Sequence, residues 1–157
     1  MPFPGDAGHA TLSARSARAG SSQRDDRYRR RSPMTLRKSI RQAHTSGPQP
    51  DAKDAATLEF CFPADDPTFA GHFPTRPLLP GVFQLEMARF AAEAVLHCPL
   101  AVREITKAKF LRPIIPAETV RVELKLSAKA DTIQVRASFS VTGRPAGEAL
   151  LQLARTS

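Results

Sequence analysis

The feature that most constrains the fold is an apolar stretch near the middle of the chain, residues 81–97. Its apolar side chains point in nearly every direction around a helix, whereas a surface helix would show a one-sided stripe. A helix of this kind must be enclosed by the rest of the protein. The exception is one narrow stripe of charged residues at helical spacing, formed by Glu86, Arg89 and Glu93.

Alternating apolar and polar residues predict β-strands around this helix. Residues 57–62 alternate before it, and four segments follow it: 105–112, less sharply, then 120–127, 133–141 and 149–153. One face is apolar and the other is polar, as in an antiparallel sheet packed on one side. Turns are predicted at Ala130-Asp131 and at Gly143-Arg144-Pro145. An enclosed helix and a one-faced sheet predict an α+β fold in which a curved antiparallel sheet wraps a long central helix, the hot-dog fold.

The first third of the chain differs in composition from the rest. Residues 1–53 hold few large apolar side chains, so we expect a disordered basic tail there and one folded domain over 54–157. Residues 1–54 carry eleven Lys/Arg against five Asp/Glu, which is most of the formal net charge of +8. The arginine cluster at 27–31 is compatible with nucleic-acid binding, with a solvated tail, or with a segment upstream of a true start at Met34. We expect no nucleic-acid partner.

Several classes of protein are disfavoured. The two cysteines, Cys61 and Cys98, make no disulfide framework and lack the spacing with histidine that a zinc site needs. No metal, flavin or nucleotide motif is present, so we expect no metal and no cofactor. No apolar run reaches the length of a membrane span. These observations predict a cytoplasmic protein without a transmembrane segment.

The loop before the central helix carries the candidate chemistry. Four prolines at 67, 74, 77 and 80 stiffen it, so it can hold His72 in one pose. Pro80-Gly81 marks the helix start, where partial positive charge suits an oxygen that becomes negative during a reaction. Glu86 follows a little over one turn later.

This stretch resembles a known signature. His72-Phe73-Pro74, Pro77, Pro80-Gly81-Val82 and Leu85-Glu86 are similar to the motif of the 3-hydroxyacyl-[acyl-carrier-protein] dehydratases, a hot-dog family of fatty-acid and polyene synthesis. A weaker second block, residues 109–116, resembles the family's next strand, and the likeness covers about residues 58–153. Thr75-Arg76 and Arg89-Phe90 depart from the commoner members, in which an Ala-Gln pair at the second place helps to orient the acid. The departures favour a specialised branch, such as aryl-polyene or secondary lipid synthesis.

The resemblance implies dehydration of a 3-hydroxyacyl thioester to a trans-2-enoyl thioester. His72 would accept the C2 proton, Glu86 would protonate the leaving hydroxyl, and the backbone N–H of Gly81 would polarise the carbonyl. Glu86, in an apolar tunnel, is expected to stay protonated. Substrate-binding residues would be Phe73, Pro80 and Val82. The substrate would be carried on the phosphopantetheine of acyl carrier protein, and the enzyme would be a homodimer or a higher even oligomer.

Each residue also has a simpler interpretation. His72 could face solvent, Gly81 could serve only a tight turn, and Glu86 could pair with Arg89 in a charged stripe, which would hold its carboxylate ionised and weaken it as an acid. The cations that could contact the acidic carrier protein could equally form a solubilising sheet face. These cations are Arg76, Lys107, Lys109 and Arg112.

Two other functions remain open. In a hot-dog thioesterase, Glu86 would activate water and the thioester bond would break. In a non-catalytic acyl-binding or assembly subunit, the fold would be kept without chemistry.

Overall fold

The computed structural model describes residues 33–69 and 75–157, which belong to one compact unit. His72, Phe73 and the arginine cluster at 27–31 lie outside the described residues. The elements of the described part are α2 (Pro33–Ala43), β1 (His44–Ala52), β2 (Ala55–Cys61), the 3-10 helix η1 (Pro67–Phe69), α3 (Gly81–Leu96), β3 (Leu100–Phe110), β4 (Thr119–Lys129), β5 (Thr132–Val141) and β6 (Arg144–Arg155).

The six strands form one antiparallel sheet in the order β1-β2-β4-β5-β6-β3. Tight turns join β4 to β5 at the predicted Ala130-Asp131 and β5 to β6 at Thr142-Gly143, whereas Arg144 and Pro145 of the second predicted turn are the first residues of β6. The second of them contains Thr142 and Gly143, both at positive φ, which matches the twist of a two-residue hairpin. β3 follows α3 in the chain but pairs with β6 at the far side of the sheet. The two edges of the sheet are therefore β1 and β3.

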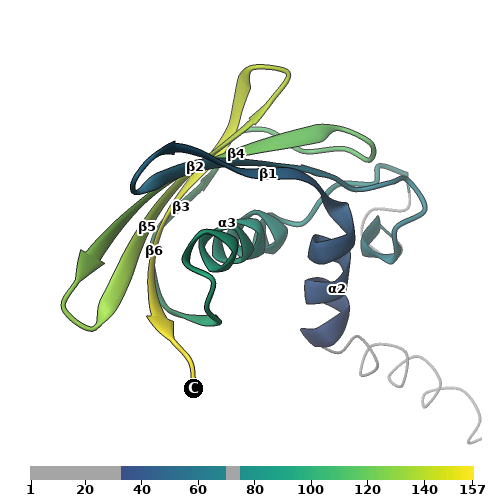
Figure 1. Ribbon diagram of the computed structural model, residues 1–157. Coiled ribbons are helices and arrows are strands. Elements are labelled where there is room, and N and C mark those ends of the chain that lie inside the picture. The colour runs from purple at the N-terminus through teal and green to yellow at the C-terminus, as the bar shows by residue number, and fades with distance from the viewer. Residues whose placement is uncertain (1–32, 70–74) are drawn as a thin grey trace, which may run out of the picture. The chain divides into compact units, whose positions relative to one another are not determined.

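The sheet curves around α3, which lies against its inner face (Figure 1). Alternate residues of the central strands point toward the helix, and the register sets Val122 of β4 opposite Phe139 of β5, both at most 1% exposed. Helix α3 contributes four wholly buried residues to the same core, namely Met87, Ala88, Ala91 and Ala92. Small alanine side chains let the sheet approach the helix closely, so the core is dense. This arrangement confirms the predicted α+β hot-dog fold.

Helix α3 begins and ends within one residue of the prediction. Pro80 is its N-cap in an extended conformation, as suits a residue with fixed φ and no N–H to donate. His97 at the C-cap is left-handed, with φ of 52°, and turns the chain toward β3. The enclosed helix thus has its first turn, with Gly81, at a defined place beside the sheet.

The expectation of disorder over residues 1–53 is wrong for residues 33–52, where the structure has α2 and β1. In α2, Leu36, Ile40 and Ala43 share one face because they are four and three residues apart. Ile40 and Ala43 are each 1% exposed, and Leu36 packs against the same core. The composition was too polar on average to reveal that a few well-placed apolar side chains suffice to dock a short helix.

The residues of β1 do not follow the pattern of a strand, so the sequence did not predict it. Gly47, Pro48 and Pro50 read as a loop, because proline cannot donate to a sheet ladder. β1 is an edge strand that pairs only with β2, with several irregularities of register, and such an edge tolerates proline. No helix of the described part is both long enough and apolar enough to cross a membrane.

Candidate active site

The described part of the proline-rich loop is fixed at its end. Arg76 is exposed, whereas Leu79 is 6% exposed and its N–H donates to the carbonyl of Ile114, at 2.8 Å. This bond ties the residue before the Pro-Gly pair to the connection between β3 and β4. The entry into α3 is therefore held by the sheet side of the protein, while the roles predicted for His72 and Phe73 stay predictions.

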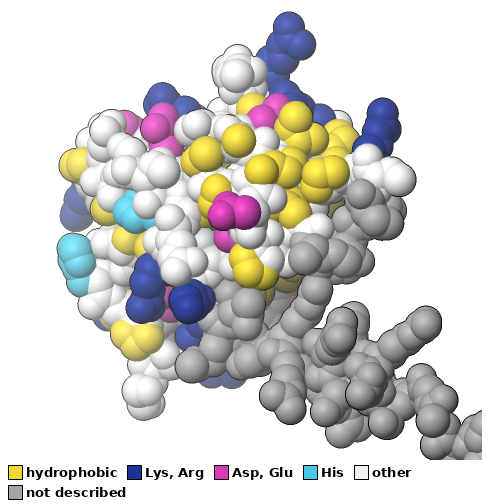
Figure 2. Space-filling model, turned by 90° about the vertical axis from the view of Figure 1, so that its right-hand side faces the viewer, with side chains coloured by type: hydrophobic (Ala, Val, Ile, Leu, Met, Phe, Trp, Pro, Cys, Tyr) yellow, Lys and Arg dark blue, Asp and Glu magenta, His cyan; other side chains and the backbone are white. Residues whose placement is uncertain are grey.

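Apolar side chains surround the start of α3. The ring of Phe110 lies over Gly81, because a Cβ at Gly81 would be 2.6 Å from Cε2 of that ring. Phe110 and Val82 are nonetheless about half exposed. The other exposed large apolar side chains of the described part are Ile105, Leu111 and Ile115. Figure 2 shows hydrophobic side chains gathered on one face of the protein. The helix start is thus an apolar surface suited to an acyl chain or a second protein.

Gln84 is a polar residue whose position the sequence did not explain. Its side chain lies in the first turn of α3, is 3% exposed, and packs against Gly147 of β6. Among the described residues, its Oε1 atom finds no hydrogen-bond partner, which is uncommon for a buried acceptor. The sequence does show Gln84 as a polar residue within an otherwise apolar stretch. Its polarity alone, however, does not reveal that its side chain is buried.

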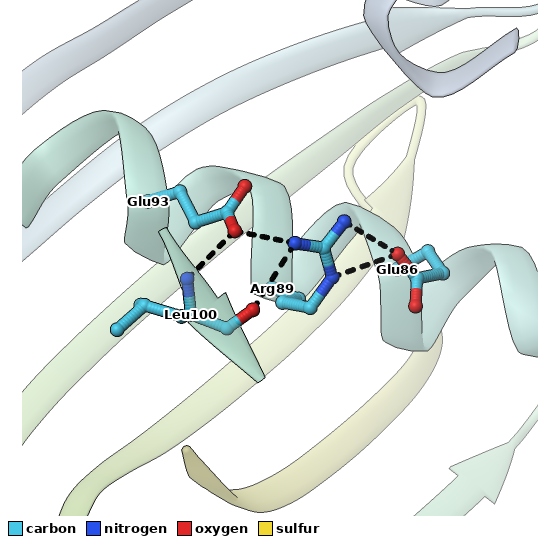
Figure 3. Close-up of polar contacts among 4 residues, drawn as sticks. All are labelled: Glu86, Arg89, Glu93 and Leu100. Atoms are coloured by element: carbon cyan, nitrogen blue, oxygen red, sulfur yellow. Dashed lines mark hydrogen bonds and ion pairs between the residues drawn. The ribbon is translucent and has the colours of Figure 1, made fainter. Parts of the chain in front are cut away.

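Glu86, Arg89 and Glu93 form the main polar network of the helix (Figure 3). Arg89 is 4% exposed. Its Nε and Nη2 both lie 2.8 Å from Oε2 of Glu86, and its Nη1 donates to Oε1 of Glu93 and to the carbonyl of Leu100. Glu93 also accepts the N–H of Leu100 at 2.8 Å. The network therefore joins the helix to the first residue of β3.

The pairing of Glu86 with Arg89, left open by the sequence, is present in the structure. The Glu86 side chain is 20% exposed. The side chain is thus partly exposed and bonded to Arg89, where the sequence suggested an acid enclosed in an apolar tunnel. Whether Glu86 is catalytic stays a prediction.

Phe90 packs away from this network. Its ring lies 5.2 Å from the ring of His44 and 5.8 Å from that of Phe60. His44 also contacts Phe60, and its Nε2 lies 3.0 Å from the carbonyl oxygen of Ser46. This half-buried histidine went unnoticed because it lies in the segment expected to be disordered, and its contacts are those of a packed aromatic cluster.

Three of the four cations expected to contact a carrier protein have carboxylate partners. Lys107 lies 2.7 Å from Glu148 and Lys109 lies 3.8 Å from it, while Arg112 lies 2.6 Å from Glu118. The hydrogen bond from Lys107 lowers the pKa of Glu148 below its ordinary value. These pairs agree with a solubilising sheet face, and the carrier contact stays a prediction.

Two further features concern possible metal ligands and a hollow on the sheet. Within residues 33–69 and 75–157, no three His, Cys, Asp or Glu side chains gather as metal ligands would. A hollow of about 530 Å³ lies on the outer face of the sheet, lined by residues that include Lys125, Arg136 and Glu148. Its lining contains no residue of α3, so it is separate from the site around Gly81 and Glu86.

Comparisons with known proteins cover most of the described fold. Residues 48–147 match the ApeI-like family, which is described as ApeI dehydratase. Two relatives named 3-hydroxyacyl-[acyl-carrier-protein] dehydratase FabZ are similar in sequence. The one from Desulforamulus reducens is 38% identical over 45% of this chain and 54% of its own length. The one from Pelotomaculum thermopropionicum is 35% identical over 58% of this chain and 71% of its own length.

A solved structure is also similar. It is the dehydratase heterocomplex ApeI:P from Xenorhabdus doucetiae, with a TM-score of 0.59 and 25% sequence identity, covering 68% of this chain and 93% of that one. The matches to the two FabZ relatives span about half and about seven tenths of their lengths. The matched region 48–147 includes Gly81, Glu86 and Arg89.

Proposed function

Because this chain belongs to the ApeI-like dehydratase family, we propose that it removes water from a 3-hydroxyacyl thioester on acyl carrier protein and yields the trans-2-enoyl thioester. The observation that carries the proposal is the family match over residues 48–147, which spans the whole Pro80–Glu86 motif at the start of the enclosed helix. The named FabZ relatives support the same reaction class.

The elimination needs a base at C2, a proton for the leaving hydroxyl and a donor to the thioester carbonyl. We assign these roles to His72, Glu86 and the backbone N–H of Gly81. The first turn of α3 supports the third role, since helix N-termini stabilise negative charge. The substrate is carried by phosphopantetheine, with Phe73, Pro80 and Val82 lining its path.

A homodimer would complete the site, because in the family resembled the histidine and the acid face each other across a dimer interface. The exposed apolar side chains around Phe110 and the open edge strand β3 support such an assembly. The solved relative is titled a heterocomplex, so a different second subunit is the alternative partner.

A thioesterase is the second candidate, and the Arg89–Glu86 pair favours it. A glutamate side chain held in place by an arginine can activate water for attack on a thioester. The third candidate is a non-catalytic subunit, for which the heterocomplex relative is the only support.

The deciding experiment incubates the full chain with 3-hydroxyacyl carrier protein and follows the carrier by intact mass spectrometry. A dehydratase lowers the mass of the acylated carrier protein by one water. A thioesterase releases the free acid and leaves carrier protein without its acyl group, and a binding subunit leaves the mass unchanged. Either of the last two results overturns the proposed reaction.

Variants of the two proposed catalytic side chains identify the site. His72→Ala and Glu86→Gln should each lower turnover by roughly 10²–10⁴-fold, the usual contribution of a positioned acid or base. Asp131→Asn, an exposed residue of the turn between β4 and β5, is the control and should keep full activity. Full activity in either of the first two variants would remove that residue from the mechanism.

A further inference from the structure

Arg89 is a charged residue that lies buried in the protein. A guanidinium on a solubilising helix stripe would extend into water, yet Arg89 is 4% exposed. Taking a charge out of water is costly unless it is paired and hydrogen-bonded. Arg89 meets that requirement with two carboxylates and one backbone carbonyl. The three charged residues are therefore a built network inside the fold, and a solvated stripe does not describe them.

The two carboxyl oxygens of Glu86 differ in their contacts with this network. Nε and Nη2 of Arg89 both contact Oε2. Within residues 33–69 and 75–157, Oε1 receives no hydrogen bond, and Figure 3 shows it pointing away from Arg89. Arg89 thus holds one oxygen, and no described residue bonds the other.

The far side of Arg89 is anchored to the sheet. Glu93 accepts from Arg89 and from the N–H of Leu100, and the carbonyl of Leu100 accepts from Arg89. Leu100 is the first residue of β3 and is 1% exposed. The place of the Glu86 carboxylate is therefore set by the corner between α3 and β3, and does not depend on the rotamer preference of Glu86 alone.

We propose that Arg89 is the positioning residue of this site, holding Glu86 by Oε2 and presenting Oε1 to the 3-hydroxyl group of the acyl substrate. This role rests on the proposed function. Arg89 acts through Glu86 and does not touch the substrate. Glu86 then gives the proton on Oε1 to the leaving hydroxyl, which departs as water, while His72 takes the C2 proton as in the proposed function.

Kinetics of four variants test the role: Arg89→Met, Arg89→Lys, Glu86→Gln and the double variant Arg89→Met/Glu86→Gln. Arg89→Met should lower kcat by at least about tenfold and change KM by less than about threefold, since a misplaced group affects the reacting state more than binding. Arg89→Lys should recover part of the loss, because lysine keeps the charge but not the paired donors.

The double variant separates positioning from a general structural effect. In the Glu86→Gln background, Arg89→Met should cost less than about twofold in kcat, because residues that act as a unit are not additive. Equal losses in both backgrounds, or a kcat for Arg89→Met within about twofold of the wild type, would overturn the proposal. Arg121→Met makes the same substitution in the exposed Arg121–Glu123 pair and should leave kcat unchanged.

A second readout needs no activity. The same variants are unfolded in urea, and a coupling between Arg89 and Glu86 should appear as non-additive losses of stability. If the wild type does not dehydrate the substrate, the proposed function fails, and the unfolding cycle still decides whether Arg89 holds Glu86. Additive losses would overturn the positioning role. Should Arg89→Met fail to fold, the cycle is run with Arg89→Lys.

Discussion

At the scale of single residues, the ion pairs of this protein differ in what surrounds them. Arg89 is buried, so its partners decide where it lies, whereas Lys107 and Glu148 are each more than two fifths exposed. Exposed pairs contribute little to stability because water and salt screen them. The effect of an exposed pair is therefore easier to detect in the pKa of its carboxyl group than in the free energy of unfolding.

Lys107→Met should raise the pKa of Glu148 toward its ordinary value, because the hydrogen bond from Lys107 is the largest cause of its lowering. A carboxylate with a lowered folded pKa adds stability above its unfolded pKa, and that contribution is lost as the pH falls through the folded pKa. The variant should therefore lose less stability than the wild type on acidification through that window.

The measurement is a ¹³C NMR titration of the Glu148 carboxyl, with urea unfolding at neutral and acidic pH. The neighbouring cations Lys109 and Arg136 also lower the pKa of Glu148, so part of the shift should persist. An unchanged titration midpoint in Lys107→Met would show that the pair does not form in solution.

At the scale of elements, α2 shows how little apolar surface a docked helix needs. Ile40 is 1% exposed, and Ser39 donates to Asp66 beside η1 at 3.2 Å. Short helices are marginal alone and take their stability from tertiary contacts. α2 is therefore held by the core that α3 and the sheet provide.

Ile40→Ala should lower the free energy of unfolding by about 2–4 kcal/mol, from lost burial and the cavity left behind. Urea unfolding followed by circular dichroism measures the loss. Gln42→Ala, exposed on the same helix, is the control and should change stability by less than about 0.5 kcal/mol. Equal stability of the two variants would mean that α2 does not dock in solution.

At the scale of the whole molecule, the two sheet edges are not equivalent. β1 contains Pro48 and Pro50 and pairs irregularly, features that protect an edge from further pairing. β3 has no proline, its register is regular from Lys107 to Phe110, and Ile105 is 50% exposed. We therefore expect the second copy of the chain to join at β3.

Ile105→Glu should shift the protein from dimer to monomer in sedimentation velocity at micromolar concentration, since a charge in an apolar interface is poorly solvated. Ser127→Glu adds the same charge at an exposed position of β4 and should leave the dimer intact. A wild type that sediments as a monomer, or a dimer that is insensitive to Ile105→Glu, would contradict the expectation.

Local patterns were enough for much of the fold. The bounds of α3 and the presence of the strands after it follow from periods of helix and sheet, which depend on neighbouring residues alone. The predicted starts were wrong for two strands, since β3 begins at Leu100 and β6 at Arg144. The motif at Pro80–Glu86 likewise identified the start of α3 as the candidate site, because its residues are close in sequence. Residues 48–147, which match the family, include this motif.

The sequence by itself therefore determined the enclosed helix, the one-faced sheet and the family. Only the tertiary structure decided that residues 33–52 are ordered, that β3 is an edge, and that Arg89 is buried against Glu86. Helical spacing permits that ion pair equally in water and in a core. Which of the two occurs depends on side chains far away in the chain, and these meet only when the sheet closes around the helix.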